Sequence, residues 1–111
     1  MTGREERFVS VASELDVPAG EVVVVRAEGR SLCLAHCEDG SWGAIDNVCT
    51  HDGGPLGEGT LRAGRVICPR HGAAFDARTG RVLSLPAVRS VQAYPVSVEG
   101  DGIYIDCETV Q

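Results

Sequence analysis

The amino-acid sequence predicts an all-β fold, a small antiparallel β-sandwich or barrel. Short apolar runs recur along the chain with turn residues between them, at the spacing of roughly 8–12 residues that is typical of such folds. Some of the turns carry hairpin signals, such as Gly100-Asp101-Gly102. No long segment has the apolar periodicity of an amphipathic helix. Because the chain has 111 residues, we expect a single domain that spans 1–111.

The N-terminal half contains four expected strands. After the first of them, Val11–Leu15 is expected to make a single helical turn. The second strand is rich in valine, which favours extended backbone. Glu28-Gly29-Arg30 forms a tight connection to the third strand, and Glu38-Asp39-Gly40-Ser41 forms a hairpin turn into the fourth. The four expected strands are Arg7–Val11, Glu21–Ala27, Ser31–Cys37 and Trp42–Asn47.

The C-terminal half continues the strand pattern, but two loops interrupt it. The segments 49–59 and 68–72 are rich in glycine and proline, and each contains a cysteine and a histidine. Loops held by a rigid β scaffold are where function concentrates. Asp76 and Thr79-Gly80 indicate a turn after the second loop. The expected strands in this half are Arg65–Cys68, Ala74–Asp76, Arg81–Leu83, Ser90–Glu99 and Gly102–Asp106.

Charge and apolar content exclude two classes of partner. The chain has 16 acidic and 10 basic residues, a net charge of −6, which excludes nucleic-acid binding driven by bulk positive charge. No run approaches the roughly 18 apolar residues of a membrane span, and the N-terminus does not resemble a signal peptide. We therefore expect no membrane partner and a cytoplasmic location. In that reducing compartment, five cysteines indicate metal binding rather than disulfide bonds.

The two interrupting loops form a paired cysteine–histidine pattern. Cys49-X-His51 is followed, after 16 intervening residues, by Cys68-X-X-His71. Zinc fingers usually pair like ligands, whereas here each loop offers one thiolate and one imidazole. Such a mixture suits a site with two chemically distinct metal centres. A structural zinc site, in a zinc-binding interaction module, remains the alternative from a different functional class.

The segments CTHDGGPLGEG, which begins at Cys49, and VICPRHGAAFDARTG, which begins at Val66, resemble the Rieske [2Fe–2S] family. The resemblance implies one [2Fe–2S] cluster per chain, held by a cluster-binding subdomain of two loops. It also implies that Cys49 and Cys68 bind one iron while His51 and His71 bind the other. In the proteins that this chain resembles, a third, proline-bearing loop covers the cluster, and Pro86 matches that position.

Departures from other Rieske proteins indicate the type. Respiratory members carry a membrane anchor and an extra cysteine in each cluster loop, where this chain has Gly54 and Arg70. High-potential members have serine and tyrosine hydroxyls near the cluster, where this chain has Ala73 and Phe75. Fewer hydrogen bonds to the cluster stabilise its reduced form less. We expect a soluble ferredoxin with a reduction potential near the low end of the Rieske range.

The resemblance therefore implies a one-electron carrier and not an enzyme, with no catalytic residues. The expected electron donor is a flavin-containing reductase and the expected acceptor is a terminal oxygenase. The small Rieske subunit of a nitrite reductase is the alternative within the fold. The acidic remainder of the chain is expected to steer a basic partner. The expected docking face comprises His51, His71, Gly54, Pro55, Leu56, Arg70 and Pro86.

The remaining cysteines and the third histidine are interpreted as structural. On a strand, Cys33 and Cys37 share one face while His36 points to the other. We expect both cysteines in the core and His36 half-exposed. Cys107 is expected to be a partly exposed thiol, and Trp42 to pack on the core.

Overall fold

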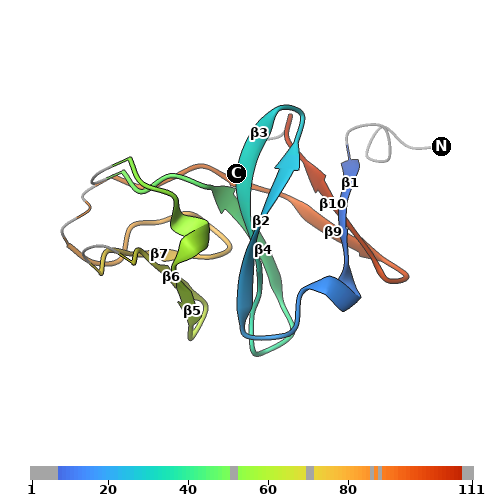
Figure 1. The fold of residues 1–111 in the computed structure, drawn as a ribbon, viewed down its shortest axis with the longest axis horizontal. Helices are drawn as coiled ribbons and strands as arrows, with labels where there is room; N and C mark the ends of the chain where they lie inside the picture. Colours follow the sequence, from blue (N-terminus) through green and yellow to red (C-terminus); the bar gives the residue numbers. More distant parts are fainter. Residues whose placement is uncertain (1–7, 51–52, 70–71, 86, 88, 109–111) are drawn as a thin grey trace.

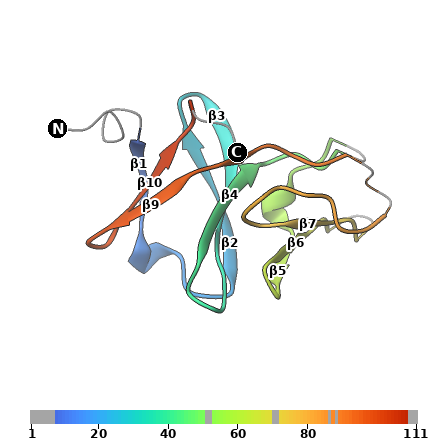
Figure 2. The same ribbon diagram turned by 180° about the vertical axis from the view of Figure 1, so that it is seen from behind.

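A computed structural model describes residues 8–50, 53–69, 72–85, 87 and 89–108. Among them, ten strands form three antiparallel sheets, which confirms the predicted all-β class. The sheets are arranged as three layers along the long axis, with β1, β9 and β10 at one end and β5–β7 at the other (Figure 1). The view from behind shows the same order (Figure 2).

The central sheet has the strand order β2-β3-β4-β8, and its neighbour has the order β1-β10-β9. All seven strands pair antiparallel, so short turns connect most of them. The central strands are β2 (Glu21–Ala27), β3 (Arg30–His36), β4 (Trp42–Asp46) and β8 (Ala93–Tyr94). The strands of the neighbouring sheet are β1 (Phe8–Ser13), β9 (Val96–Glu99) and β10 (Gly102–Asp106).

The central sheet buries both of its faces, in two separate cores. On β3, Leu32 and Leu34 pack toward the β1-β10-β9 sheet, while Cys33 and Ala35 pack toward the opposite side. This alternation is the period of two that a strand imposes on its side chains. The near-continuous apolar character of β3 is explained by this double burial.

Residues 47–92 form an insertion lobe between β4 and β8. The lobe begins and ends at one place, because Asp46 N donates to Gln92 O at 2.9 Å. Its own sheet has the order β5-β6-β7, preceded by a short 3₁₀ turn. The elements are η2 (Leu56–Glu58), β5 (Thr60–Arg62), β6 (Arg65–Ile67) and β7 (Ala74–Asp76).

Gly43 lets the lobe approach the central sheet closely. A Cβ built on Gly43 would lie 2.1 Å from Ala77 O and 2.9 Å from Arg78 Cα. Both contacts are backbone, so only a residue without a Cβ fits between β4 and the turn after β7. The position of the lobe on the sheet therefore depends on this glycine.

Three of the sequence expectations differ from the structure. The predicted strand Arg81–Leu83 is reduced to one isolated bridge, between Phe75 and Val82, and on its other side Val82 N donates to the Ser90 hydroxyl and not to a strand. The predicted strand Ser90–Glu99 is divided at Pro95, which has no N–H to donate, so that β8 pairs with β4 and β9 pairs with β10. Strand β5 was not predicted at all.

The helical content is small. The single turn expected over Val11–Leu15 is a 3₁₀ turn, η1 (Glu14–Asp16), whose N-cap Ser13 accepts from Leu15 N at 3.3 Å. Across the described residues, no helix has the length and apolarity needed to cross a membrane.

Candidate metal centre

Cys49 opens a loop that two backbone hydrogen bonds close. Cys49 N donates to Gly54 O at 2.7 Å, and Gly53 N donates back to Cys49 O at 2.7 Å. Gly53 has φ 76°, in the left-handed region that favours glycine. The described part of this loop therefore turns back on itself with the cysteine at its base.

Cys68 opens a second loop with the same pattern. Cys68 N donates to Ala73 O at 2.7 Å, and Gly72 N donates to Cys68 O at 3.1 Å. Gly72 has φ 77°, nearly equal to that of Gly53. The two loops thus share one construction, a cysteine whose N–H and carbonyl bond the residues five and four positions later. His51 and His71 fall inside these loops and lie outside the described residues, as do Asp52 and Arg70.

The two loop cysteines belong to one core. Cys49 is 0% exposed and Cys68 is 2% exposed, and both lie in the core cluster between the lobe and the central sheet. All five cysteines are buried thiols. Two sulfurs brought together in an apolar core, from two matched loops, are the donor set that thiophilic iron or zinc requires.

Asn47 ties the first loop to the central sheet. Its Oδ1 accepts from Gly57 N at 2.7 Å and from Cys33 Sγ at 3.3 Å, while its Nδ2 donates to Ser31 Oγ at 3.0 Å. Gly57 lies in η2, directly after the first loop, so this amide fixes both ends of the segment that contains Cys49. A Cβ on Gly57 would lie 2.2 Å from Val24 Cγ2, so η2 rests directly on β2.

Replacing Asn47 with leucine should lower the free energy of unfolding by about 2 kcal/mol, because Gly57 N–H and Ser31 lose their partner. Urea unfolding of the holoprotein measures the change. Asn47→Asp is the matched control, since its carboxylate still accepts from Gly57 N and the Ser31 hydroxyl can rotate to donate to it. Equal stability of Asn47→Leu and the wild type would contradict this role of the amide.

Cys33 is a hydrogen-bond donor to Asn47 inside the core. Burial, with a smaller contribution from the Asp46 carboxylate, raises the pKa of Cys33 to about 12. The thiol form donates a hydrogen bond to Asn47 Oδ1 at 3.3 Å. Cys33 and Cys37 share one core, as predicted.

The burial of His36 and Trp42 agrees with the sequence prediction, whereas that of Cys107 does not. His36 is half-buried, as expected, and it stacks on Trp42 with ring centroids 3.9 Å apart. The His36 Nδ1 lies 2.8 Å from Val17 O. The prediction of a partly exposed Cys107 is wrong: the side chain is 6% exposed, because it packs in the second core, and burial raises its pKa.

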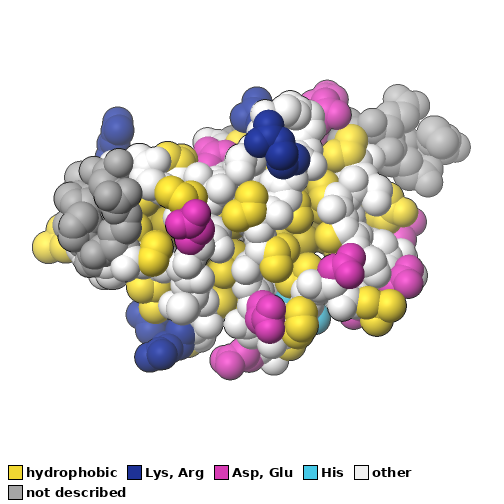
Figure 3. Space-filling model, viewed as in Figure 1, with side chains coloured by type: hydrophobic (Ala, Val, Ile, Leu, Met, Phe, Trp, Pro, Cys, Tyr) yellow, Lys and Arg dark blue, Asp and Glu magenta, His cyan; other side chains and the backbone are white. Residues whose placement is uncertain are grey.

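The third loop, residues 83–90, places apolar side chains on the surface beside the cysteine loops. Leu85 is 76% exposed and Leu83 is 42% exposed. The loop is hydrogen-bonded to both cysteine loops, since Thr50 Oγ1 donates to Arg89 O at 2.5 Å and Ser84 Oγ donates to Gly72 O at 3.5 Å. Pro86 lies outside the described residues. In Figure 3, hydrophobic side chains are visible on the insertion lobe at the left end of the molecule.

Leu56 is not part of the molecular surface. The sequence placed Leu56 on the expected docking face, but its side chain is 0% exposed. It packs in the same core as Cys49 and Cys68, because η2 turns it inward. Pro55 is half-buried and remains accessible in part.

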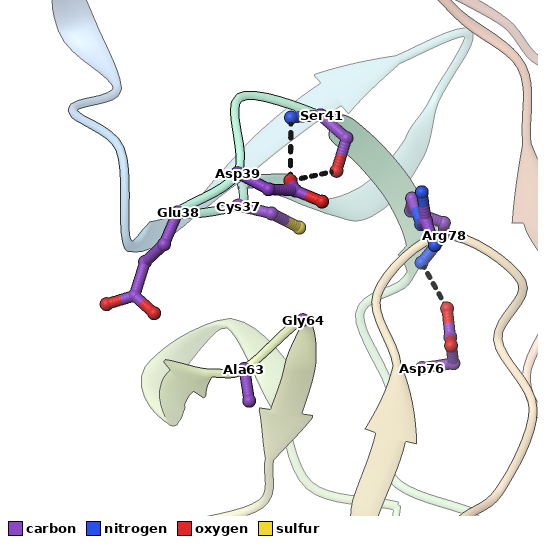
Figure 4. Close-up of a pocket in the computed structure, with 8 residues that line it drawn as sticks. All are labelled: Cys37, Glu38, Asp39, Ser41, Ala63, Gly64, Asp76 and Arg78. Carbon is purple, nitrogen blue, oxygen red and sulfur yellow. Dashed lines mark hydrogen bonds between the residues drawn. The ribbon is translucent and has the colours of Figure 1, made fainter.

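A separate cleft of about 270 Å³ lies between the β3–β4 turn and the lobe (Figure 4). Two of its three carboxylates have partners within their own turns: Asp39 accepts from Ser41 N and Oγ, and Asp76 accepts from Arg78 N. The Ser41 hydrogen bonds lower the pKa of Asp39. The cleft is lined by Cys37, Glu38, Asp39, Ser41, Ala63, Gly64, Asp76 and Arg78.

Comparison with known proteins identifies the family. Residues 7–95 match the Rieske [2Fe–2S] domain. The chain belongs to the Rieske [2Fe–2S] family. Rieske domains bind a [2Fe–2S] cluster. Only part of the pattern could be found from the sequence: the cysteines and histidines were evident, whereas Asn47 carried no motif signal.

Relatives of this Rieske chain are small ferredoxins. It is 36% identical over 101 residues to the ferredoxin component of a naphthalene 1,2-dioxygenase system from Pseudomonas aeruginosa, covering 91% of this chain and 96% of the relative. It resembles the ferredoxin of carbazole 1,9a-dioxygenase from Nocardioides aromaticivorans IC177, with a TM-score of 0.83, 32% identity, and coverage of 88% and 95% of the two chains.

A third similar structure comes from a complex. It is described as the complex of reduced oxygenase and oxidized ferredoxin in carbazole 1,9a-dioxygenase, and it matches with a TM-score of 0.82 and 28% identity. The match covers 90% of this chain and 93% of that one. Our Rieske chain therefore shares its fold with these ferredoxins over nearly the whole of the compared chains.

The residues at the centre fit a Rieske cluster. Cys49 and Cys68 would be able to supply two thiolates, since both are buried at the base of loops that contain a glycine of positive φ. Ala73 and Phe75 are both 0% exposed and present no hydroxyl in this core. The chain thus has apolar side chains at the two positions where high-potential Rieske proteins have hydroxyl donors.

Proposed function

We propose that this protein is a soluble one-electron carrier that delivers electrons to a terminal oxygenase. The observation that carries the proposal is the pair of matched loops that bury Cys49 and Cys68 in one core. The ferredoxin names of its relatives, and the oxygenase complex of one of them, support the same function. When bound, a [2Fe–2S] cluster accepts and releases one electron.

The proposed ligands are Cys49 and Cys68 on one iron and His51 and His71 on the other. The cysteine side supports this assignment, because Cys49 and Cys68 begin two loops of the same construction and lie in one core. The histidines are assigned from their places in the motif alone. In this role the protein exchanges an electron without transforming a substrate, so it has no catalytic residue.

The proposed docking face surrounds the three loops. His51, His71, Arg70 and Pro86 are assigned to it from the sequence, and Pro55 is accessible in part. Leu85, which is 76% exposed, is the apolar contact we add in place of the buried Leu56. A flavin-containing reductase as the donor and a terminal oxygenase as the acceptor would use this face in turn, and we place the exchange in the cytoplasm.

The dioxygenase names of the relatives favour the oxygenase role over a nitrite reductase subunit.

Spectra of the purified protein distinguish a [2Fe–2S] cluster from the alternative of a zinc site. A reduced sample should give the rhombic EPR signal of a Rieske centre with two iron atoms per chain. A colourless protein that holds zinc and remains EPR-silent after dithionite would overturn the proposal.

The reduction potential tests the ferredoxin type. With Ala73 and Phe75 in the core in place of hydroxyl donors, the reduced cluster receives fewer stabilising hydrogen bonds. We expect a value near the low end of a range of roughly −150 to +300 mV. A spectroscopic redox titration measures it, and a potential above about +100 mV would contradict the expectation.

A further inference from the structure

The charges of the chain are divided unequally between the insertion lobe and the rest. Residues 47–92 contain six arginines and three acidic residues, a net charge of +3. The remainder contains four arginines and thirteen acidic residues, a net charge of −9. The overall value of −6 therefore conceals a lobe of the opposite sign.

The described arginines of the lobe lie on its surface. Arg62, Arg65, Arg81 and Arg89 are all exposed. Among the described acidic residues of the lobe, Glu58 is exposed, whereas Asp76 is half-buried and its carboxylate accepts from the turn N–H groups of Arg78 and Thr79. In Figure 3, dark blue side chains occupy two places at the left end, while most magenta side chains lie toward the centre and right.

Cross-strand neighbours of opposite charge are not present for all of these exposed arginines. Arg62 lies directly opposite Arg65 in the β5–β6 hairpin. Like charges at such positions are destabilising, although Asp76 compensates Arg65 from its other side. Arg89 lies beside the first cysteine loop, because its carbonyl accepts from Thr50 Oγ1 at 2.5 Å. Positive charge therefore extends from the lobe's hairpin to the edge of the docking face.

Salt screening decides which charge a partner meets. At physiological ionic strength, exposed charges are screened over about 8 Å. The molecule is 44 Å long, with the lobe at one end of that axis (Figure 1). The acidic residues of the β1-β10-β9 sheet lie toward the opposite end of this axis from the lobe, whereas those of the central sheet lie between the two (Figure 1). A partner close to the loops consequently meets the local arginines and not the net charge of −6.

We propose that the docking face is flanked by an arginine surface that receives an acidic surface on the redox partner. This inference rests on the proposed carrier function. It reverses the partner charge expected from the whole-chain value, for which a basic partner was the natural choice. Carboxylates around the partner's own redox group would orient the lobe toward it and accelerate the encounter.

Small oxidants of defined charge test the local sign. The dithionite-reduced holoprotein is mixed in a stopped-flow instrument with hexacyanoferrate(III), which takes one electron and becomes hexacyanoferrate(II). The rate constant should fall several-fold as ionic strength rises from about 10 to about 300 mM, as for opposite charges. With tris(phenanthroline)cobalt(III), a cation, the rate should not fall. A hexacyanoferrate rate that rises with salt would overturn the inference.

Charge-reversal variants locate the effect. Arg89→Glu should lower the low-salt hexacyanoferrate rate by about threefold or more, and Arg81→Glu should lower it in the same direction. Arg26→Glu changes the net charge equally on β2, and should leave the rate unchanged. Equal losses in all three variants would overturn the inference, because they would show that only total charge matters. A wild-type protein without a reducible cluster would instead contradict the proposed function.

Discussion

Replacing Cys68 with alanine should give a colourless protein with background iron content and no Rieske EPR signal. Cys68 is 2% exposed at the base of the second loop, and its sulfur has no substitute nearby on that loop. One thiolate cannot hold an iron that needs two. Iron analysis, absorption and EPR of the purified variant measure the result.

Cys37→Ala is the matched control for this change. Cys37 is 3% exposed and lies in the same core, but on the strand side and outside both loops. Its replacement should cost about 1 kcal/mol of stability while colour, iron and EPR signal persist. If Cys37→Ala lost the cluster and Cys68→Ala kept it, the ligand assignment would be wrong.

Replacing Gly43 with alanine should destabilise the protein by about 3 kcal/mol. The new Cβ would lie 2.1 Å from Ala77 O, and backbone on both sides leaves no flexible side chain to move away. The lobe must therefore shift from β4, which also disturbs the core around Cys49. Chemical unfolding followed by circular dichroism measures the loss.

Gly29→Ala separates this steric effect from backbone strain. Gly29 has φ 77° and open space around the position of a Cβ. Alanine there should cost only about 1 kcal/mol, through its unfavourable backbone conformation. Should Gly43→Ala prove no more destabilising than Gly29→Ala, close packing of the lobe on β4 would be refuted.

Much of the fold was predictable because it depends on local pattern. The bounds of β2, β7 and β10 match the sequence prediction, since turn residues delimit each apolar run. Strand β5 could not be predicted in this way. Thr60–Arg62 is short and largely polar, and it is extended because β6 pairs with it after the Ala63-Gly64 turn. Tertiary pairing, and not propensity, makes it a strand.

The site residues could be predicted from the sequence where the residue type itself indicates metal binding. They could not be predicted where their role depends on packing. Cys49 and Cys68 could be chosen because they stand in loops with histidines. Asn47 could not, because its partners Ser31 and Gly57 are 16 and 10 residues away along the chain. Leu56 was misplaced for a similar reason: its neighbours suggested an exposed loop, but the η2 turn directs it into the core.

The separation of the two cores has a consequence for how the protein acquires its iron. The core between the central and β1-β10-β9 sheets contains none of the described residues of the insertion lobe, whereas the core with Cys49 and Cys68 depends on the lobe. The sandwich can therefore fold before any metal arrives, with the lobe closed at its neck by Asp46 and Gln92. In such an apoprotein the sandwich is already folded when the cluster is inserted into the lobe. Synthesis of the chain and insertion of its cofactor therefore need not occur at the same time.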